Sequence, residues 1–294
     1  MNDILSRFHD KSFWTSLVPG LRIEDRASFS DIKAWEVPGR EETVFQALLD
    51  REGYVHMPGL QSPERARKLA DAATRLVNAG IPAVFCMVFD EFWIPAFSLA
   101  KILKTALGAA YSMLPDFWVY HIDPALSERG WTPHREKGRE ALFPDGRPKS
   151  VSVWLALSAA TPLNGCMYIV PADRDPTYGT EDDDKWTFKY PEVRALPAAA
   201  GDVFMWNQAL LHWGAHASPR ADEARISVAF EFQRNDVEPF NKPLLPPQAI
   251  LGFADRLKLI GKQVIQYRHM YVLPPEMETV ARALVGGAPS EAGR

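Results

Sequence analysis

The chain has 294 residues, of which 47% are hydrophobic and 24% are charged, and its formal net charge is −4. This composition is average for a soluble globular protein and excludes a mostly disordered chain. No cluster of lysine and arginine marks a nucleic-acid-binding surface, and two cysteines are too few for a disulfide framework. The longest apolar run, residues 81–89, is about half of what a membrane span requires.

The first residues lack the charged start and apolar run of a signal peptide. We therefore expect a cytoplasmic protein that binds neither nucleic acid nor membrane. No linker rich in glycine, serine or proline divides the chain, so a single domain over residues 1–294 is expected.

The N-terminal part, residues 1–115, is predicted to be a mostly helical extension with one short strand near residues 53–57. Ser62 is a good N-cap for the helix that follows this strand, and Gly80 suits its end. A second helical stretch is predicted over residues 96–113.

Residues 116–235 have a different character, with short β-rich runs separated by glycine, proline and asparagine. This spacing favours a sandwich or a closed double sheet. We predict a mainly β fold with flanking helices and a jelly-roll core, followed by a C-terminal helix within residues 245–273, where apolar residues recur every three or four positions. The predicted strands are Phe117–His121, Val151–Leu157, Cys166–Val170, Asp202–Trp206 and Arg225–Phe232.

Candidate metal ligands lie within this β region. In an extended segment, residues two apart point to the same face, so His134 and Glu136 would face one point while Arg135 faces away. An imidazole and a carboxylate are two of the three ligands in the 2-His-1-carboxylate triad, which suits non-heme Fe(II). The third ligand should come from a distant strand, and His212, just before Gly214, is the candidate.

A candidate anion-binding pair follows His212 along the chain. On a strand, Arg225 and Ser227 share a face. A guanidinium can bind a carboxylate through two hydrogen bonds, and a hydroxyl can add a third. The sequence therefore predicts a carboxylate site beside the metal.

These pieces together resemble the phytanoyl-CoA dioxygenase family of Fe(II)- and 2-oxoglutarate-dependent oxygenases. The resemblance covers roughly residues 48–235, which is most of the chain. It rests on the segment Glu52–Leu60 with the helix after it, on Asn164–Pro171, and on Gly201–Val203 through His212 and Arg225.

The resemblance implies a double-stranded β-helix, also called a jelly-roll or cupin-like fold, with flanking helices. It implies Fe(II) held by His134, Glu136 and His212, and 2-oxoglutarate held by Arg225, with Ser227 beside it. The expected activity is that of a dioxygenase using Fe(II), 2-oxoglutarate and O2. The usual outcome is hydroxylation of a small organic molecule, such as a lipid, an amino acid or a secondary metabolite, with release of succinate and CO2.

The sequence departs from the family pattern at two places. The carboxylate is Glu136 where the family usually has Asp, and the hairpin ends in residues 171–175 without the usual Gly-Ser-His group. Related halogenases lack the ligand carboxylate altogether, so Glu136 predicts no halogenation. The second departure changes the rim of the site.

Several alternatives remain open. His121 and Asp123 form a rival pair, and His216 is a rival to His212. Within the loop of residues 173–190, the acidic run 181–184 is interpreted as solvated, and the residues after it as part of a lid. Trp154 and Trp206 are interpreted as core residues.

Other function classes are also open. The same cofactors could serve desaturation or ring formation. The chain could instead be a non-catalytic jelly-roll binding protein, or a metal-dependent cupin isomerase that needs neither Arg225 nor 2-oxoglutarate. The sequence leaves the substrate and the oligomeric state undefined.

Overall fold

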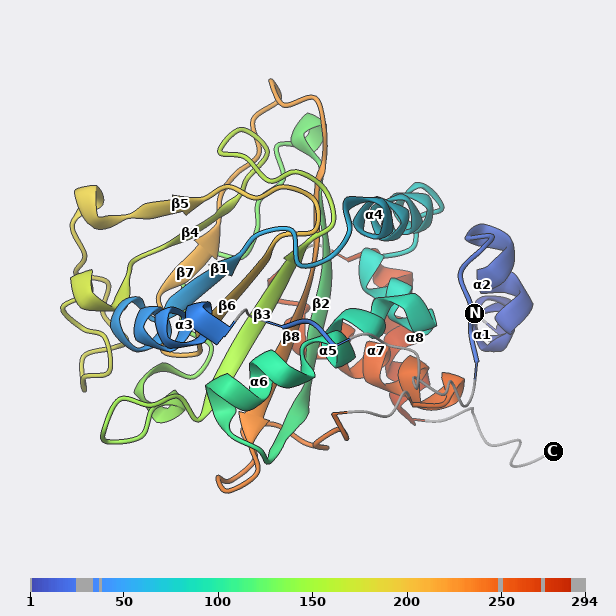
Figure 1. Cartoon of the computed structure of the whole chain (residues 1–294). Coiled ribbons are helices and arrows are strands. Elements are labelled where there is room, and N and C mark those ends of the chain that lie inside the picture. Colours follow the sequence, from blue (N-terminus) through green and yellow to red (C-terminus); the bar gives the residue numbers. More distant parts are fainter. Residues whose placement is uncertain (1, 25–33, 37–38, 248–250, 271–272, 287–294) are drawn as a thin grey trace.

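Two antiparallel β-sheets form the centre of the molecule (Figure 1). The computed structural model describes residues 2–24, 34–36, 39–247, 251–270 and 273–286. The larger sheet has the order β1-β6-β3-β8-β2 and consists of β1 (Tyr54–Met57), β2 (Tyr111–Ile122), β3 (Ser150–Ala156), β6 (Val203–Asn207) and β8 (Arg225–Arg234). The smaller sheet has the order β5-β4-β7 and consists of β4 (Met167–Ile169), β5 (Arg194–Leu196) and β7 (His212–Gly214).

The two sheets pack face to face through a small apolar cluster. Trp154 and Phe204 of the larger sheet meet Met167, Ile169 and Leu196 of the smaller one. This arrangement agrees with the predicted double-stranded β-helix core.

The other face of the larger sheet is covered by helices, so its strands are buried on both sides. Along β8, Ile226, Val228 and Phe230 point to the helices, whereas Arg225 and Ala229 point into the space between the sheets. The alternation follows from the two-residue period of a strand. Because both faces of the sheet are covered, β3 and β6 are buried along their whole length.

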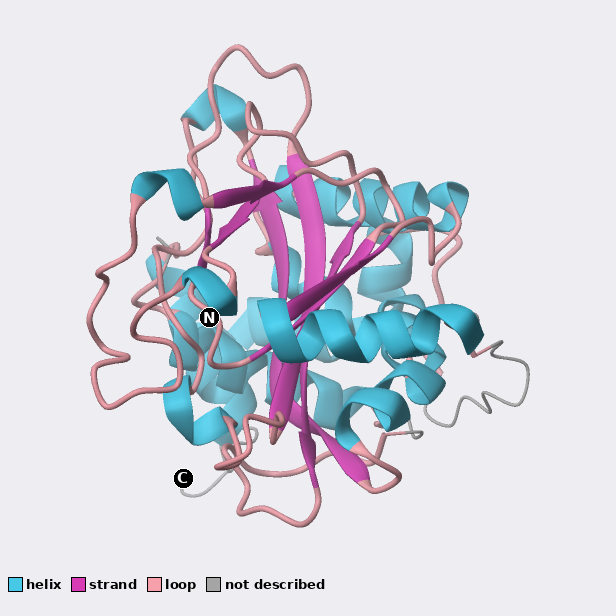
Figure 2. Cartoon of the chain, turned by 60° about the vertical axis from the view of Figure 1, so that its left-hand side comes forward, coloured by secondary structure: helices cyan, strands magenta, loops and turns pink. Residues whose placement is uncertain are grey.

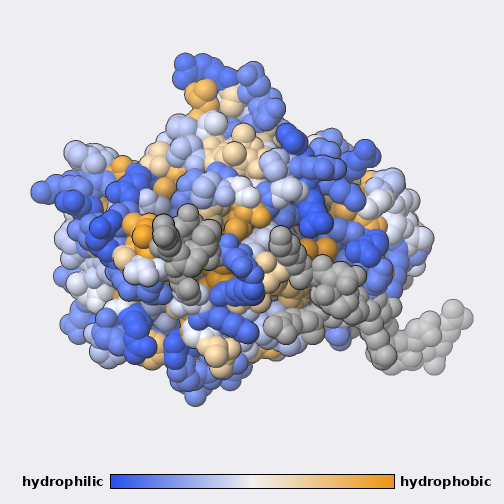
Figure 3. Space-filling model, viewed as in Figure 1, coloured by the Kyte–Doolittle hydropathy of each residue, from blue (hydrophilic) through white to orange (hydrophobic). Residues whose placement is uncertain are grey.

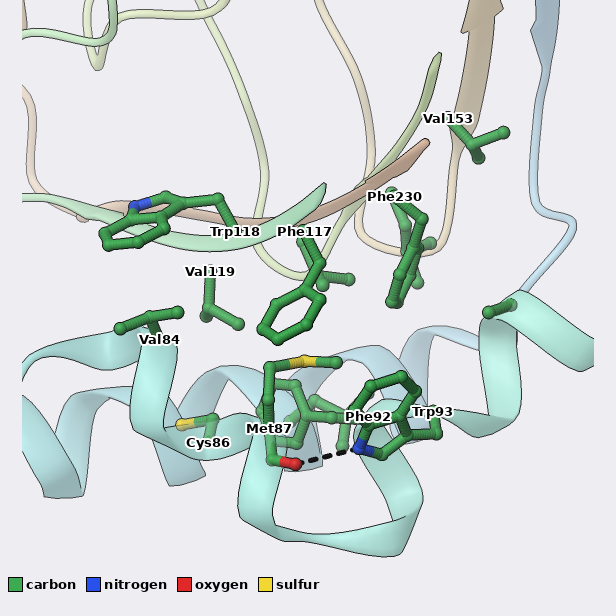
Figure 4. Close-up of a cluster of buried hydrophobic side chains, with 14 of the residues drawn as sticks. Val84, Cys86, Met87, Phe92, Trp93, Phe117, Trp118, Val119, Val153 and Phe230 are labelled. Atoms are coloured by element: carbon green, nitrogen blue, oxygen red, sulfur yellow. Dashed lines mark hydrogen bonds between the residues drawn. The ribbon is translucent and has the colours of Figure 1, made fainter. Parts of the chain in front are cut away.

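Helices surround the sheets on several sides (Figure 2). One helical segment lies directly on β2 (Figure 4). It consists of η1 (Ala83–Val88), η2 (Asp90–Phe92) and Trp93. There Met87 and Trp93 meet Phe117 from β2 and Phe230 from β8, and the Trp93 indole donates a 2.8 Å hydrogen bond to the Met87 carbonyl.

The α-helices are α1 (Asn2–His9), α2 (Lys11–Leu17), α3 (Gly39–Glu52), α4 (Pro63–Asn78), α5 (Ile94–Ser98), α6 (Ala100–Leu107), α7 (Phe253–Tyr267) and α8 (Pro275–Gly286). Helix α3 packs against β1, and α4 and α7 contact η1. Short 3-10 turns also occur in the loops, at η3 (Pro124–Leu126), η4 (Gly138–Ala141), η5 (Ala172–Arg174) and η6 (Tyr190–Glu192).

A buried ion pair ties α7 to the rest of the helical layer. The Arg256 guanidinium lies 2.6 Å from the Asp90 carboxylate, and both side chains are fully buried. Arg256 also donates to the carbonyls of Glu24, Val88 and Leu251, so its hydrogen-bonding capacity is well used.

The N-terminal elements agree with the sequence in part. The Ser62 hydroxyl accepts a hydrogen bond from the Arg65 N–H at 3.3 Å, as expected for the N-cap of α4. The single helix predicted over residues 96–113 is wrong. The segment instead contains α5, α6 and the start of β2, because Gly108 ends α6 with φ +89° and the chain then pairs with β8.

The C-terminal region contains one helix more than predicted. Helix α7 lies within residues 245–273, as predicted, and a second helix that the sequence did not indicate, α8, begins at Pro275. Proline is compatible with the first turn of a helix, which explains the difference. Residues 248–250 and 271–272 lie outside the described residues. The division of the chain into a single domain with three parts stays a prediction.

The part of the surface seen in Figure 3 is mostly hydrophilic, with small separate hydrophobic patches. Within the described ranges, no helix combines the length and apolar character needed to cross a bilayer.

Candidate active site

The three predicted metal ligands come together at one end of the sandwich. His134 and Glu136 lie in the loop between β2 and β3, and His212 is the first residue of β7. The backbones of the two histidines exchange hydrogen bonds of 3.0 and 3.1 Å, which attach the loop to β7. One potential ligand atom from each of the three side chains lies within 4.8 Å of the others.

Backbone carbonyls fix the orientation of both imidazoles. Nδ1 of His134 lies 2.7 Å from the Thr132 carbonyl, and Nδ1 of His212 lies 3.0 Å from the Leu210 carbonyl. A carbonyl accepts only, so each Nδ1 is the protonated nitrogen and each Nε2 carries a lone pair. His212 Nε2 lies 3.4 Å from Glu136 Oε1. Two metal bonds of about 2.1 Å at a right angle place their donor atoms about 3 Å apart.

The Glu136 carboxylate is held by the floor of the larger sheet. Its Oε1 accepts hydrogen bonds from the Ser152 hydroxyl at 2.7 Å and from the Trp206 indole at 3.0 Å. Ser152 of β3 and Trp206 of β6 are directly opposite each other in the sheet, so the two donors lie side by side under the carboxylate. Its Oε2 is buried without a hydrogen-bond partner. The longer side chain of glutamate thus reaches the sheet, where Oε1 faces His212 and Oε2 stays without a partner, so the carboxylate keeps lone pairs for a cation.

Burial sets the protonation states of the three ligands. It is the main cause that lowers the pKa of His134 and of His212 to about 4, and the His212 imidazole adds to the shift of His134. Burial raises the pKa of the Glu136 carboxyl. Metal ligands must be neutral imidazoles and an ionised carboxylate, and a divalent cation would supply the charge that stabilises that carboxylate. Two imidazole nitrogens and one carboxylate oxygen fit a non-heme Fe(II) site.

Arg225 lies in the same pocket, on the inner face of β8. Its side chain is buried, with Nε donating to the Gly165 carbonyl at 3.0 Å and Nη1 donating to the Ser227 hydroxyl at 3.1 Å. Its Nη2 is buried without a partner. Burial lowers the pKa of Arg225 to about 10, so the guanidinium keeps its charge at pH 7. Ser227 contacts Arg225, and its part in the site is to orient the guanidinium.

Two glycines allow the chain to pass close to the unpartnered Nη2. A Cβ added to Gly130 would lie 2.6 Å from the Cα of Gly214 and 3.0 Å from Arg225 Nη2. A Cβ on Gly214 would lie 2.7 Å from the Cα of Gly130. Any larger residue would therefore crowd the guanidinium.

The sequence analysis missed a role for Trp154. Its indole N–H lacks a hydrogen-bond partner although the side chain is buried, and its ring lies 5.9 Å from the Arg225 guanidinium carbon. It also lines the pocket that contains the three ligands. The signal in the sequence is its position two residues after Ser152, on the same face of β3.

The contacts of Arg135, the residue between the two candidate ligands, could not be predicted from the sequence. It does face away from the ligands, but into the protein and not into solvent. Its guanidinium forms a buried ion pair with Asp175 at 2.7 Å and donates to the carbonyls of Ala209 and Asp183 and to the Thr177 hydroxyl. It therefore connects the ligand loop to the chain before His212 and to the loop of residues 173–190.

The rival histidines lie outside the ligand group. His121 neighbours Tyr120, which lines the pocket, so its own side chain points to the other face of β2. The Asp123 carboxylate accepts from the Ala125 N–H at 2.8 Å and caps η3. His216 is exposed beyond the end of β7. Among the described residues, the group that could hold a metal contains none of these three.

The loop of residues 173–190 is partly buried. Asp175 and Thr177 are buried around Arg135, whereas most of the acidic run 181–184 is exposed, as is Trp186 with 55% of its surface. The Asp183 carboxylate accepts from the Arg139 N–H beside the ligand loop. This loop therefore borders the candidate metal site.

Comparison with known families supports the resemblance seen in the sequence. Residues 87–221 match the family model described as phytanoyl-CoA dioxygenase (PhyH). This match confirms the predicted resemblance and enzyme class, a 2-oxoglutarate-dependent non-heme iron oxygenase with Fe(II), 2-oxoglutarate and O2 as cofactors. A search of curated proteins gives no match.

Several solved structures share the fold. The α-ketoglutarate-dependent epimerase SnoN from nogalamycin biosynthesis is 18% identical, with a TM-score of 0.50 over 70% of this chain and 93% of its own. HygX from Streptomyces hygroscopicus, with nickel and 2-oxoglutarate, is 14% identical, with a TM-score of 0.51 over 67% and 88%. The non-heme monooxygenase ThoJ is 14% identical, with a TM-score of 0.56 over 82% and 98%. These similarities confirm the predicted fold class.

Two of these proteins have been solved with small molecules. SnoN was solved with Fe3+, α-ketoglutarate and nogalamycin RO, and HygX with nickel, 2-oxoglutarate and hygromycin B.

Proposed function

We propose that this chain, which carries a PhyH domain, binds Fe(II) through His134, Glu136 and His212 and binds 2-oxoglutarate through Arg225. Its expected reaction is the oxidation of a small organic molecule, usually hydroxylation, with release of succinate and CO2. Small-molecule ligands in SnoN and HygX support this class of substrate. We further propose a cytoplasmic location.

One observation carries the proposal: a cluster of potential metal ligands and an unpartnered guanidinium nitrogen lie in one pocket. Ligand atoms of His134, Glu136 and His212 lie within 4.8 Å of one another, and the Glu136 Oε2 and the Arg225 Nη2 are buried without partners. A buried polar group without a partner costs roughly 1–3 kcal/mol. Such atoms gathered in one place indicate ligands of complementary charge, a cation at the carboxylate and an anion at the guanidinium.

Each residue of the pocket has a defined task. The Arg225 guanidinium binds the far carboxylate of 2-oxoglutarate, and the unpartnered indole N–H of Trp154, whose ring lies 5.9 Å from that guanidinium, donates to the same molecule. Ser152 and Trp206 hold the Glu136 carboxylate in place. When bound, iron and 2-oxoglutarate supply the oxidising chemistry, because these side chains cannot oxidise a substrate by themselves.

The test is anaerobic visible spectroscopy of the metal-free protein after addition of Fe(II) and then 2-oxoglutarate. Wild type should develop a weak charge-transfer band. His134→Ala should show no band, because an iron ligand is missing. Arg225→Ala should keep the iron and need about 100-fold more 2-oxoglutarate, because a charge-assisted bidentate contact is lost.

Matched controls are His121→Ala and Arg220→Ala, which remove a histidine and an arginine outside the pocket and should behave as wild type. A band that survives in His134→Ala would contradict the assignment of the ligands. If wild type binds a divalent metal but gives no band with 2-oxoglutarate, the isomerase or binding-protein alternative is correct. Once the band is seen, succinate release identifies substrates and their products.

A further inference from the structure

The active-site pocket continues beyond the iron ligands, away from Arg225. Along β8, the pocket-lining residues run from Arg225 through Ala229 to Glu231. The six steps from Arg225 to Glu231 along a strand span about 20 Å. The pocket therefore has a cationic end at Arg225 and a second end with different chemistry. The side chains of that second end are Asp116, Trp118, Trp131, Glu231 and Tyr267.

Aromatic rings form one side of this second end. The Trp131 ring lies 4.6 Å from the Tyr267 ring, 5.5 Å from Tyr120 and 6.4 Å from Trp118, measured between centroids. It also lies 5.7 Å from the His134 imidazole. The rings come from β2, from the ligand loop and from α7, so three separate elements build one aromatic wall directly beside the proposed iron site.

Two carboxylates lie at the same end. Asp116 is fully engaged, since its oxygens accept hydrogen bonds from the side chains of Asn241, Gln266 and Tyr267. Glu231 differs: its Oε2 accepts from Gln208 at 2.6 Å, but among the described residues no hydrogen-bond partner of Oε1 is found. Burial and the neighbouring Asp116 raise the pKa of Glu231 to about 8. A cation placed beside Oε1 would offset both causes.

Two lysine side chains lie near this end of the pocket, but neither lines it. Lys137 Nζ lies 3.7 Å from Glu231 Oε2, but its side chain lines a separate outer cavity with Arg139 and Asp183. Lys262 Nζ donates to the Asn241 side chain and to the Lys242 carbonyl. Neither ammonium group lies among the residues that line the aromatic end of the pocket.

An aromatic wall next to a carboxylate oxygen with spare capacity is the chemistry that recognises an organic ammonium ion. We propose that the substrate carries such a group, and that Glu231 with the rings of Trp131 and Tyr267 binds it. This inference rests on the proposed function, since it assigns the substrate of that same pocket. It also places the oxidised carbon near the charged nitrogen, because Trp131 contacts the ligand His134.

The test uses choline and its neutral carbon isostere, 3,3-dimethylbutan-1-ol, which share size and shape but differ in charge. Binding is measured by calorimetry at pH 8.5, on metal-free protein and on anaerobic protein loaded with Fe(II) and 2-oxoglutarate. Wild type should bind choline at least 10-fold more tightly than the isostere. Glu231→Gln and Trp131→Leu should each remove most of this preference, whereas the exposed Glu223→Gln should keep it.

A further variant tests the direction of the charge effect. Lys137→Gln removes the ammonium group that already lies near Glu231, so it should strengthen choline binding several-fold. Weaker choline binding in this variant would contradict the proposal, and would point to Lys137 as the contact for an anionic substrate. Equal binding of both probes, no choline binding at 20 mM, or a preference that persists in Glu231→Gln would each overturn it.

The two proposals can fail separately. If the charge-transfer band is absent while choline is preferred over its isostere, the iron and 2-oxoglutarate assignment is wrong and the cation site stands. If the band forms and the preference is absent, the oxygenase assignment stands and the substrate class is wrong.

Discussion

The two faces of the larger sheet are built from alternate residues of the same strands, yet they differ in how completely they are packed. On the outer face, Val228 and Phe230 meet the helical layer, and even the charged pair of that layer, Asp90 and Arg256, is fully bonded. On the inner face, Arg225 and Trp154 both leave buried donors without partners in one pocket, whereas among the described residues of the helical layer only Gln263 does so.

This difference separates stability from function within single strands. Burying apolar side chains stabilises the fold, whereas unpartnered polar atoms reduce its stability until a ligand binds them. Because the period of a strand is two, each pair of neighbouring residues in β8 contributes one side chain to each task. The predictions below test this division, beginning with the largest expected effect.

The first prediction compares adjacent residues of β8. Phe230→Ala should lower the free energy of unfolding by about 3–5 kcal/mol, because it leaves a cavity under the helices. Glu231→Gln should change it by less than about 1 kcal/mol at pH 5, because the raised pKa keeps this carboxyl largely protonated and an amide oxygen can still accept from Gln208. Urea unfolding of the metal-free proteins measures both. Equal losses in the two variants would show that both faces stabilise the fold alike.

The second prediction compares two tryptophans that lie on opposite faces. Trp154→Phe removes an unpartnered N–H, so stability should stay unchanged while 2-oxoglutarate binds about 10-fold more weakly, the loss of about one hydrogen bond to a charged group. Trp93→Phe removes the bond to the Met87 carbonyl and should cost about 1 kcal/mol of stability.

In Trp93→Phe, the affinity for 2-oxoglutarate should match that of wild type. Titration of the charge-transfer band gives the affinities, and urea unfolding gives the stabilities. If Trp154→Phe binds 2-oxoglutarate as wild type does, its indole is a core residue, as the sequence indicated.

The third prediction concerns pH. The pKa of Glu231 is about 8 in the folded protein and close to its ordinary 4.5 when unfolded. The folded state therefore holds a proton that the unfolded state releases, and this contribution to stability is complete below about pH 4.5 and is lost as the pH rises through 8. Between pH 5 and 8.5, wild type should lose up to about 4 kcal/mol relative to Glu231→Gln, because stability falls by about 1.4 kcal/mol per pH unit between the two pKa values.

Urea unfolding of both metal-free proteins at several pH values measures this difference in the free energy of unfolding. The histidines titrate alike in both proteins, so their contribution cancels in the difference. Glu140→Gln, which alters an exposed carboxyl, should follow the wild-type curve. A constant difference between wild type and Glu231→Gln would show that this carboxyl titrates alike in both states.

The sequence predicts the candidate ligands because their patterns are local: His134 and Glu136 are two residues apart, and His212 lies two residues before a glycine. It predicts the sandwich for the same reason, from turn residues between short β-rich runs. The bonding of Arg135 and the spare donor of Trp154 depend on partners from other strands and loops, which no spacing along the chain indicates. The helix boundary near Gly108 was misplaced because pairing with β8 decides where β2 begins.

The contacts of Arg135 have a consequence for the engineering of this scaffold. Three of the four residues that hold its guanidinium, Asp175, Thr177 and Asp183, belong to the loop that borders the candidate metal site, and the fourth is Ala209. Exchanging this loop for that of a relative, in order to change selectivity, would also remove the support of the two neighbouring ligands. Loop grafts should therefore begin after residue 183, so that selectivity can be redesigned without loss of the metal.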